Sequence, residues 1–173
     1  MVLNKLKIEK ILKKLSSIDI SIEINPNKKK KRVYSVSGLF RHSISFDGPL
    51  DLNEIELKGI IAHELGHIEK NHIFILHCFI ILLSLSWTLI VIIVLYLNVS
   101  VNWYCFLALF VILLLTLLII YGRNAERSAD IFAKNKVGKK PIIKGLEKIK
   151  KWGIEGDIIH GNTLSRIKRL EKS

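Results

Sequence analysis

The residues with the clearest chemical potential lie in the segment His63–His67, which reads HELGH. Two histidines four positions apart, with a glutamate directly after the first, form an H-E-x-x-H motif. The apolar run Ile60–Ala62 before the motif favours a helix, and on a helix positions i and i+4 share a face, so both imidazoles can bind one Zn²⁺. Glu64 would then act as general base on the metal-bound water, and Gly66 leaves room for a close neighbour. The alternative is a helix with two histidines and a solvated glutamate.

A catalytic zinc usually needs a third protein ligand and an open coordination position. The metzincin pattern requires histidine at position 73, which is Ile73 here, so that class is excluded. His72 and His77 follow the motif, and we predict that they are interfacial or intrahelical residues rather than ligands. The better candidate is Glu126, the first acidic residue after a long apolar stretch. Asp130, one turn later, could accept a hydrogen bond from a ligating imidazole. On spacing alone, a surface helix with scattered charges remains the alternative.

Two long apolar segments separate these candidate ligands. Ile73–Leu97 has 25 residues and Trp103–Tyr121 has 19, and neither contains Asp, Glu, Lys or Arg. As helices they would be about 37 Å and about 28 Å long, enough to cross a hydrocarbon core of about 30 Å. A pair of buried core helices is the alternative. The linker Asn98–Asn102 is so short that it predicts an antiparallel transmembrane hairpin.

The charges predict the orientation of this hairpin. Of the 27 Lys and Arg residues, 13 precede position 73 and 14 follow position 121, with none between. The positive-inside rule then places both flanks, both termini and the candidate site of a two-span membrane protein in the cytoplasm, or on the equivalent side of an organelle membrane. The net charge of +12 is thus explained by topology and by anionic headgroups of the lipid bilayer, and nucleic-acid binding is unlikely. The densest basic cluster, Lys28–Arg32, falls at an expected hairpin turn.

Composition excludes other classes. Half of the residues are hydrophobic and the mean hydropathy is +0.33, which argues against disorder. Two cysteines, Cys78 and Cys105, are too few for a disulfide scaffold.

The remaining segments predict an α+β domain with a small sheet, interrupted by the hairpin. Residues 1–72 and 122–173 would form its two parts, with the hairpin at 73–121. A helix is expected to begin near Asp51, with Glu54 in a capping-box-like pair, and the sequence leaves open whether this helix is continuous with the first apolar run. The other expected elements are strands at Ile18–Ile24, Val33–Ser37 and Ser43–Phe46, and helices at Met1–Ser17, Arg123–Lys136, Lys144–Lys151 (after an interruption by Gly138 and Pro141) and Thr163–Glu171.

The segments GIIAHELGHIEKNH, at Gly59–His72, and RNAERSADIFA, at Arg123–Ala133, resemble the HtpX-like membrane zinc metallopeptidases. These gluzincins also include the CAAX prenyl proteases. The chain is similar to a reduced form of that family, without an N-terminal span. The resemblance implies one Zn²⁺ per chain and a zincin-like, mainly helical core. It also implies roles for five residues: ligation by His63, His67 and Glu126, general-base catalysis by Glu64, and support of a ligand by Asp130.

The C-terminal segment resembles the same family. Members often end with a His-Pro segment followed by Arg-Ile, and here His160 and Arg166-Ile167 keep that spacing, with Gly161 and Asn162 in place of the usual prolines. The resemblance implies that His160 and Arg166 face the site and help to bind the substrate carbonyl or the developing oxyanion.

The sequence therefore predicts a membrane-embedded zinc metalloendopeptidase acting at the cytoplasmic face on membrane-associated or misfolded polypeptides. Val33–Ser37 or Ser43–Phe46 would bind the substrate backbone as an edge strand, as in gluzincins. The alternatives are a prenyl-protein-type protease, a site-2-type protease, an inactive relative and a non-enzymatic two-span adaptor. The adaptor would bind no zinc.

Overall fold

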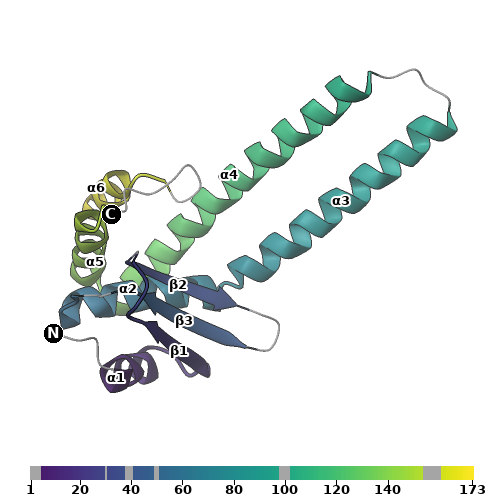
Figure 1. Ribbon diagram of the computed structural model, residues 1–173. Coiled ribbons are helices and arrows are strands. Elements are labelled where there is room, and N and C mark those ends of the chain that lie inside the picture. Colours follow the sequence, from purple (N-terminus) through teal and green to yellow (C-terminus); the bar gives the residue numbers. More distant parts are fainter. Residues whose placement is uncertain (1–4, 30, 38–40, 49–50, 98–101, 154–160) are drawn as a thin grey trace.

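A computed structural model describes residues 5–29, 31–37, 41–48, 51–97, 102–153 and 161–173 of the 173-residue chain. A compact body of helices and a small sheet carries a long helical hairpin that projects away from it (Figure 1). The elements in chain order are α1 (Lys5–Leu15), β1 (Ile20–Asn25), β2 (Arg32–Ser37), β3 (His42–Asp47), α2 (Glu54–Glu69), α3 (His72–Tyr96), α4 (Trp103–Val137), α5 (Lys139–Lys151) and α6 (Thr163–Lys172).

The three strands form a mixed sheet with the order β1-β3-β2. Strand β3 pairs with β1 in parallel and with β2 in antiparallel orientation. It takes the centre of the sheet because its apolar side chains, Ile44 and Phe46, are fully buried. The three predicted strands are confirmed, but the expected hairpin turn at Lys28–Arg32 is wrong, because β3 lies between β1 and β2. Residue 30 of that cluster lies outside the described residues.

Helix α2 begins with a capping box and ends at a backbone break. Asn53 accepts a hydrogen bond from the Glu56 amide, and the Glu56 carboxylate accepts one from the Asn53 amide, each at 2.9 Å. The capping pair is thus two residues later than the predicted pair of Asp51 and Glu54. After Glu69 the chain turns through Asn71, whose left-handed conformation has φ 51° and ψ 34°. The sequence left open whether α2 continues into α3. The left-handed Asn71 separates them into two helices, and asparagine is one of the few residue types that tolerate this conformation.

Helix α4 runs without interruption through the second apolar segment and the predicted helix Arg123–Lys136. Helix α5 then begins at Lys139, five residues earlier than expected, and includes Pro141. The expected interruption by proline is wrong because Pro141 lies in the first turn, where no intrahelical hydrogen bond is lost.

Helices α3 and α4 form the projecting hairpin, and each is long and apolar enough to cross a membrane by length and composition. None of the most apolar window of either helix is buried within the chain, so a pair of buried core helices is excluded. The two helices contact each other through Trp87, whose ring stacks on Phe106 and Phe110 with centroids 4.2 Å apart in each pair.

The core of the body surrounds α2, which packs against α4 and α5. A Cβ atom added to Gly59 would lie 2.0 Å from the Pro141 carbonyl oxygen, so glycine is required for the contact between α2 and α5. The fully buried side chains that surround α2 come from α1, the sheet and α5: Ile8, Ile44, Phe46 and Ile142.

Candidate metal centre

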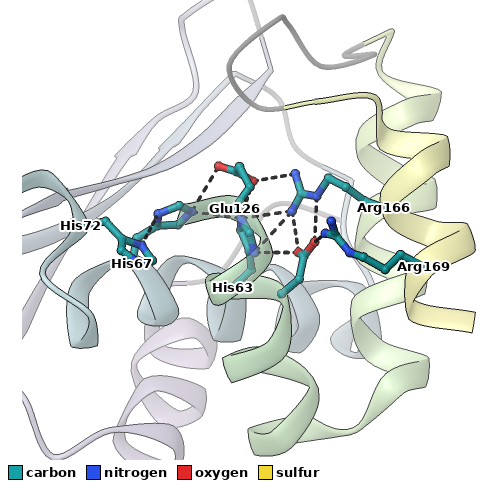
Figure 2. A network of polar contacts seen from close by, with 7 residues as sticks. His63, His67, His72, Glu126, Arg166 and Arg169 are labelled. Atoms are coloured by element: carbon teal, nitrogen blue, oxygen red, sulfur yellow. Dashed lines mark hydrogen bonds and ion pairs between the residues drawn. The ribbon is translucent and has the colours of Figure 1, made fainter. Parts of the chain in front are cut away.

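Three side chains from two helices converge on one point inside the body (Figure 2). His63 and His67 lie on α2 and Glu126 lies on α4, and their ligand atoms all lie within 4.8 Å of one another. The Nε2 atoms of His63 and His67 are 3.3 Å apart. Glu126 completes the triangle, with Oε2 at 3.3 Å from His63 Nε2 and Oε1 at 3.3 Å from His67 Nε2.

This geometry fits zinc. Bonds of about 2.0–2.1 Å in a tetrahedral site place neighbouring ligand atoms about 3.3–3.4 Å apart, and two imidazoles with one carboxylate are a common catalytic donor set. The separation of the two imidazole nitrogens matches that spacing, and each nitrogen lies at the same distance from one of the two Glu126 oxygens. In addition, Glu126 Oε2 is buried, and its polar neighbours are Arg166 Nη1 at 2.8 Å and His63 Nε2 at 3.3 Å, so the carboxylate is held beside the ligating histidines.

The two helices approach closely enough for this because small residues face each other. A Cβ atom on Gly66 would lie 2.8 Å from the Cα atom of Ala129 on α4. The room that Gly66 was predicted to leave is confirmed, and Ala129 is the neighbour that uses it. Ala125 and Ala133, one turn to either side of Ala129, are also buried and continue this face of α4.

Asp130 holds the other side of the His63 ring. Its Oδ1 atom lies 3.1 Å from His63 Nδ1, and the residue is fully buried. Burial disfavours the imidazolium, as does the charge of Arg166, but the hydrogen bonds with Asp130 and Glu126 outweigh both and raise the pKa of His63 to about 9. A carboxylate on Nδ1 fixes the proton there and leaves Nε2 to face the metal position.

Helix α6 supplies two arginines to the same cluster. The Arg166 guanidinium lies 2.8 Å from Glu126 Oε2 through Nη1, and it donates from Nη2 and Nε to the two oxygens of Asp130, at 2.7 and 3.0 Å. Arg169 donates to Asp130 Oδ2 at 2.8 Å. Burial alone would raise the pKa values of Glu126 and Asp130, but contacts with His63 and the charge of Arg166 hold both well below their usual range.

Sequence reasoning missed Arg169. The available signal was its position three residues after Arg166, which places both side chains on one face of a helix.

His72 is the second residue with an unexpected position. It is buried, and its Nδ1 lies 3.0 Å from Nδ1 of His67. As predicted, His72 is outside the group of possible metal ligands among the described residues. Its contact with His67 was not predicted, and it arises because the break at Asn71 turns His72 back towards the motif. His77 is intrahelical as predicted, with Nδ1 2.7 Å from the Ile73 carbonyl oxygen.

The remaining predicted site residues are Glu64 and His160. Glu64 lies on α2 beside the ligands and is 8% exposed. His160 lies outside the described residues, so its place relative to the metal centre stays a prediction.

A helix-borne H-E-x-x-H motif joined by a glutamate from a second helix defines a zinc-dependent metallopeptidase. Residues 24–173 match the sequence model of peptidase family M48, and the chain belongs to this family. No curated protein matches the chain.

Proposed function

We propose that this M48 metallopeptidase is a membrane-embedded, HtpX-like endopeptidase that hydrolyses membrane-associated or misfolded polypeptides at the cytoplasmic face. The observation that carries its chemistry is the convergence of His63, His67 and Glu126: the two Nε2 atoms are 3.3 Å apart, and each lies 3.3 Å from a different oxygen of the Glu126 carboxylate. An apolar hairpin inserted between the two ligand-bearing helices supports the membrane location, since it has no charged residue between positions 73 and 121.

The chain's own residues divide the catalytic work. Bound zinc would supply a Lewis acid and a water of lowered pKa. Glu64 would serve as the general base, accepting a proton at its carboxylate and later donating it to the leaving amine. Arg166 balances the two buried carboxylates, Glu126 and Asp130, and holds Glu126 toward the ligating histidines. His160 is proposed to help stabilise the developing oxyanion together with Arg166.

Strand β2 is proposed to bind the substrate backbone. Of the two strands that the sequence offered, β3, which contains Ser43–Phe46, is paired on both sides and has no open edge. The described part of β2 is an edge strand and contacts α2. Backbone pairing of an extended peptide with a free edge requires no particular side chain, which suits a protease for unfolded segments.

The test uses the full chain purified in detergent. Wild-type protein is expected to bind one zinc ion per chain and to cleave casein. Glu126→Ala should lose zinc because one of three ligands is removed, while Glu64→Gln should keep zinc and lose cleavage. Matched controls are Glu147→Ala, on the surface of α5, and Glu69→Gln, an exposed position on α2.

Each outcome decides a separate part of the proposal. Full zinc stoichiometry in Glu126→Ala would remove the ligand assignment, and full activity in Glu64→Gln would remove the mechanism. A wild-type chain that binds no zinc would support the non-enzymatic adaptor instead.

A further inference from the structure

The two ligating imidazoles have different partners on the side that faces away from the metal position. Nδ1 of His63 contacts the Asp130 carboxylate at 3.1 Å. Nδ1 of His67 contacts Nδ1 of His72 at 3.0 Å, and the two rings meet edge to face with centroids 5.0 Å apart (Figure 2). Only the first of these partners is a carboxylate, which is the usual support for a ligating histidine.

We propose that His72 is a positioning residue that orients His67 for zinc. This inference rests on the metal site proposed above. When Nε2 of neutral His67 binds the metal through its lone pair, the ring proton must be on Nδ1. Nδ1 of His72 faces that proton at hydrogen-bond distance and accepts it. His72 thus fixes both the tautomer and the rotation of the His67 ring.

His72 is held in place by the base of the hairpin. The Tyr121 hydroxyl, on α4, donates a hydrogen bond to the His72 carbonyl oxygen at 2.5 Å. Asn71, directly before it, has the left-handed conformation that ends one helix and begins the next. The residue is 9% exposed, so its side chain is packed within the protein, and these two features hold its backbone.

The geometry also separates this role from direct ligation. His72 touches the nitrogen of His67 that points away from the cluster, whereas His67 Nε2 faces His63 and Glu126. Among the described residues, the group that could hold a metal contains His63, His67 and Glu126 and not His72.

The proposal predicts that substitutions of His72 change the zinc affinity. This affinity is measured by competition with a chromophoric chelator on the detergent-purified full chain. His72→Ala should weaken zinc binding roughly 10–100-fold, the usual effect of removing a ligand's supporting group. His72→Asn should restore most of that loss, because its side-chain oxygen falls close to the position of Nδ1. His72→Gln carries its oxygen one bond further and should restore less.

His77→Ala is the matched control. This exposed histidine, on the same helix, contacts the backbone of its own helix and no ligand, so zinc affinity should not change. The melting temperature of the metal-free protein, measured in parallel, separates positioning from stability: a structural role alone would lower it in His72→Ala and leave zinc affinity unchanged.

Three results would overturn the proposal. These are unchanged zinc affinity in His72→Ala, an equal loss in His77→Ala, or no recovery in His72→Asn. The wild-type measurement distinguishes failure of the positioning role from failure of the metal site. Zinc binding by wild type that depends on Glu126 but not on His72 rejects only the positioning role, whereas absence of zinc in wild type rejects the metal site as well.

Discussion

At the scale of a single residue, Asp51 joins the part of the body that precedes the hairpin to the part that follows it. Its carboxylate accepts a hydrogen bond from Lys148 at 2.7 Å and another from Trp152 at 3.2 Å, and Lys31 is a third partner at 3.4 Å. The hydrogen bonds from Lys148 and Trp152 hold the pKa of Asp51 well below its usual range. One side chain thus connects the segment before α2 to α5 and to the residue before β2.

The Asp51 contacts predict an acid-sensitive contribution to stability. Because the pKa is lower in the folded state, the contribution is present above the unfolded value of about 3.9 and is lost as the pH falls through the folded pKa. Asp51→Asn should therefore lower the melting temperature slightly at pH 6, and its difference from wild type should shrink at pH 3. Asp19→Asn, at an exposed site, is the control. A difference of equal size at both pH values would contradict the prediction.

Spacing at the residue scale predicted the two histidines of the candidate site, whereas Glu126 followed from the return of the chain after the hairpin and Arg166 from the family resemblance. The interval of four between His63 and His67 fixes their common face on any helix, and Gly66 indicated a close neighbour. The contact of His72 with His67 could not be predicted, because on a continuous helix five residues separate two side chains by about 140°. It depends on the backbone of Asn71, and a single asparagine does not reveal whether it adopts the left-handed conformation.

At the scale of elements, the approach of α2 to α4 controls the distance between the histidines and Glu126. Gly66→Ala would force a Cβ atom to 2.8 Å from the Ala129 Cα atom, and backbone cannot rotate away as a side chain can. We expect a loss of about 1–3 kcal/mol in stability and a weaker zinc site. Thermal unfolding and chelator competition measure the two effects.

The double variant of Gly66→Ala with Ala129→Gly tests whether this contact is responsible. It removes the Cβ atom of Ala129 but not its Cα, so recovery should be partial at most. A Gly66→Ala protein with wild-type zinc affinity and melting temperature would show that α2 and α4 can move apart at this point without cost.

The edge strand gives the second prediction at this scale. Ser35→Pro, in the middle of β2, should raise KM for an unfolded substrate, because proline disturbs the backbone of the edge to which the substrate is proposed to pair; one lost backbone hydrogen bond of about 1–1.5 kcal/mol would correspond to roughly tenfold. The value of kcat should change little. Ser21→Pro on β1, the opposite edge, is the control, with melting temperatures of both variants measured alongside. Equal KM values in the two variants would exclude β2 as the substrate strand.

Secondary structure was more predictable than its assembly. Alternating isoleucines predicted β1, and the apolar runs predicted α3 and most of α4, because both signals are local periodicities. The position of β3 at the centre of the sheet depends on burial of Ile44 and Phe46 against the helices, which is a long-range effect. The start of α5 was missed because proline was treated as a break although it occupies a first turn.

At the scale of the whole molecule, the proposed topology predicts which positions a membrane-impermeant maleimide can reach. In a background with Cys78→Ser and Cys105→Ser, a cysteine at Asn102 should be labelled on intact cells, since it is the N-cap residue of α4, at the end of that helix away from the body (Figure 1). A cysteine at the exposed Lys172, in the C-terminal helix, should be labelled only after permeabilisation. The reverse pattern would place the metal centre outside the cytoplasm, and equal labelling of both would argue against a spanning hairpin.

In the proposed membrane orientation, the uninterrupted course of α4 would link the thickness of the bilayer to the geometry of the metal site. Glu126 follows the last residue of the apolar run, Tyr121, by five residues on one helix, a fixed rise of about 7.5 Å. On the other arm, the turn at Asn71 separates α3 from the helix that carries His63 and His67. In the proposed orientation, a thicker or thinner bilayer that shifts α4 along its axis moves Glu126 against the histidines by the same distance, whereas a shift of α3 is absorbed at Asn71.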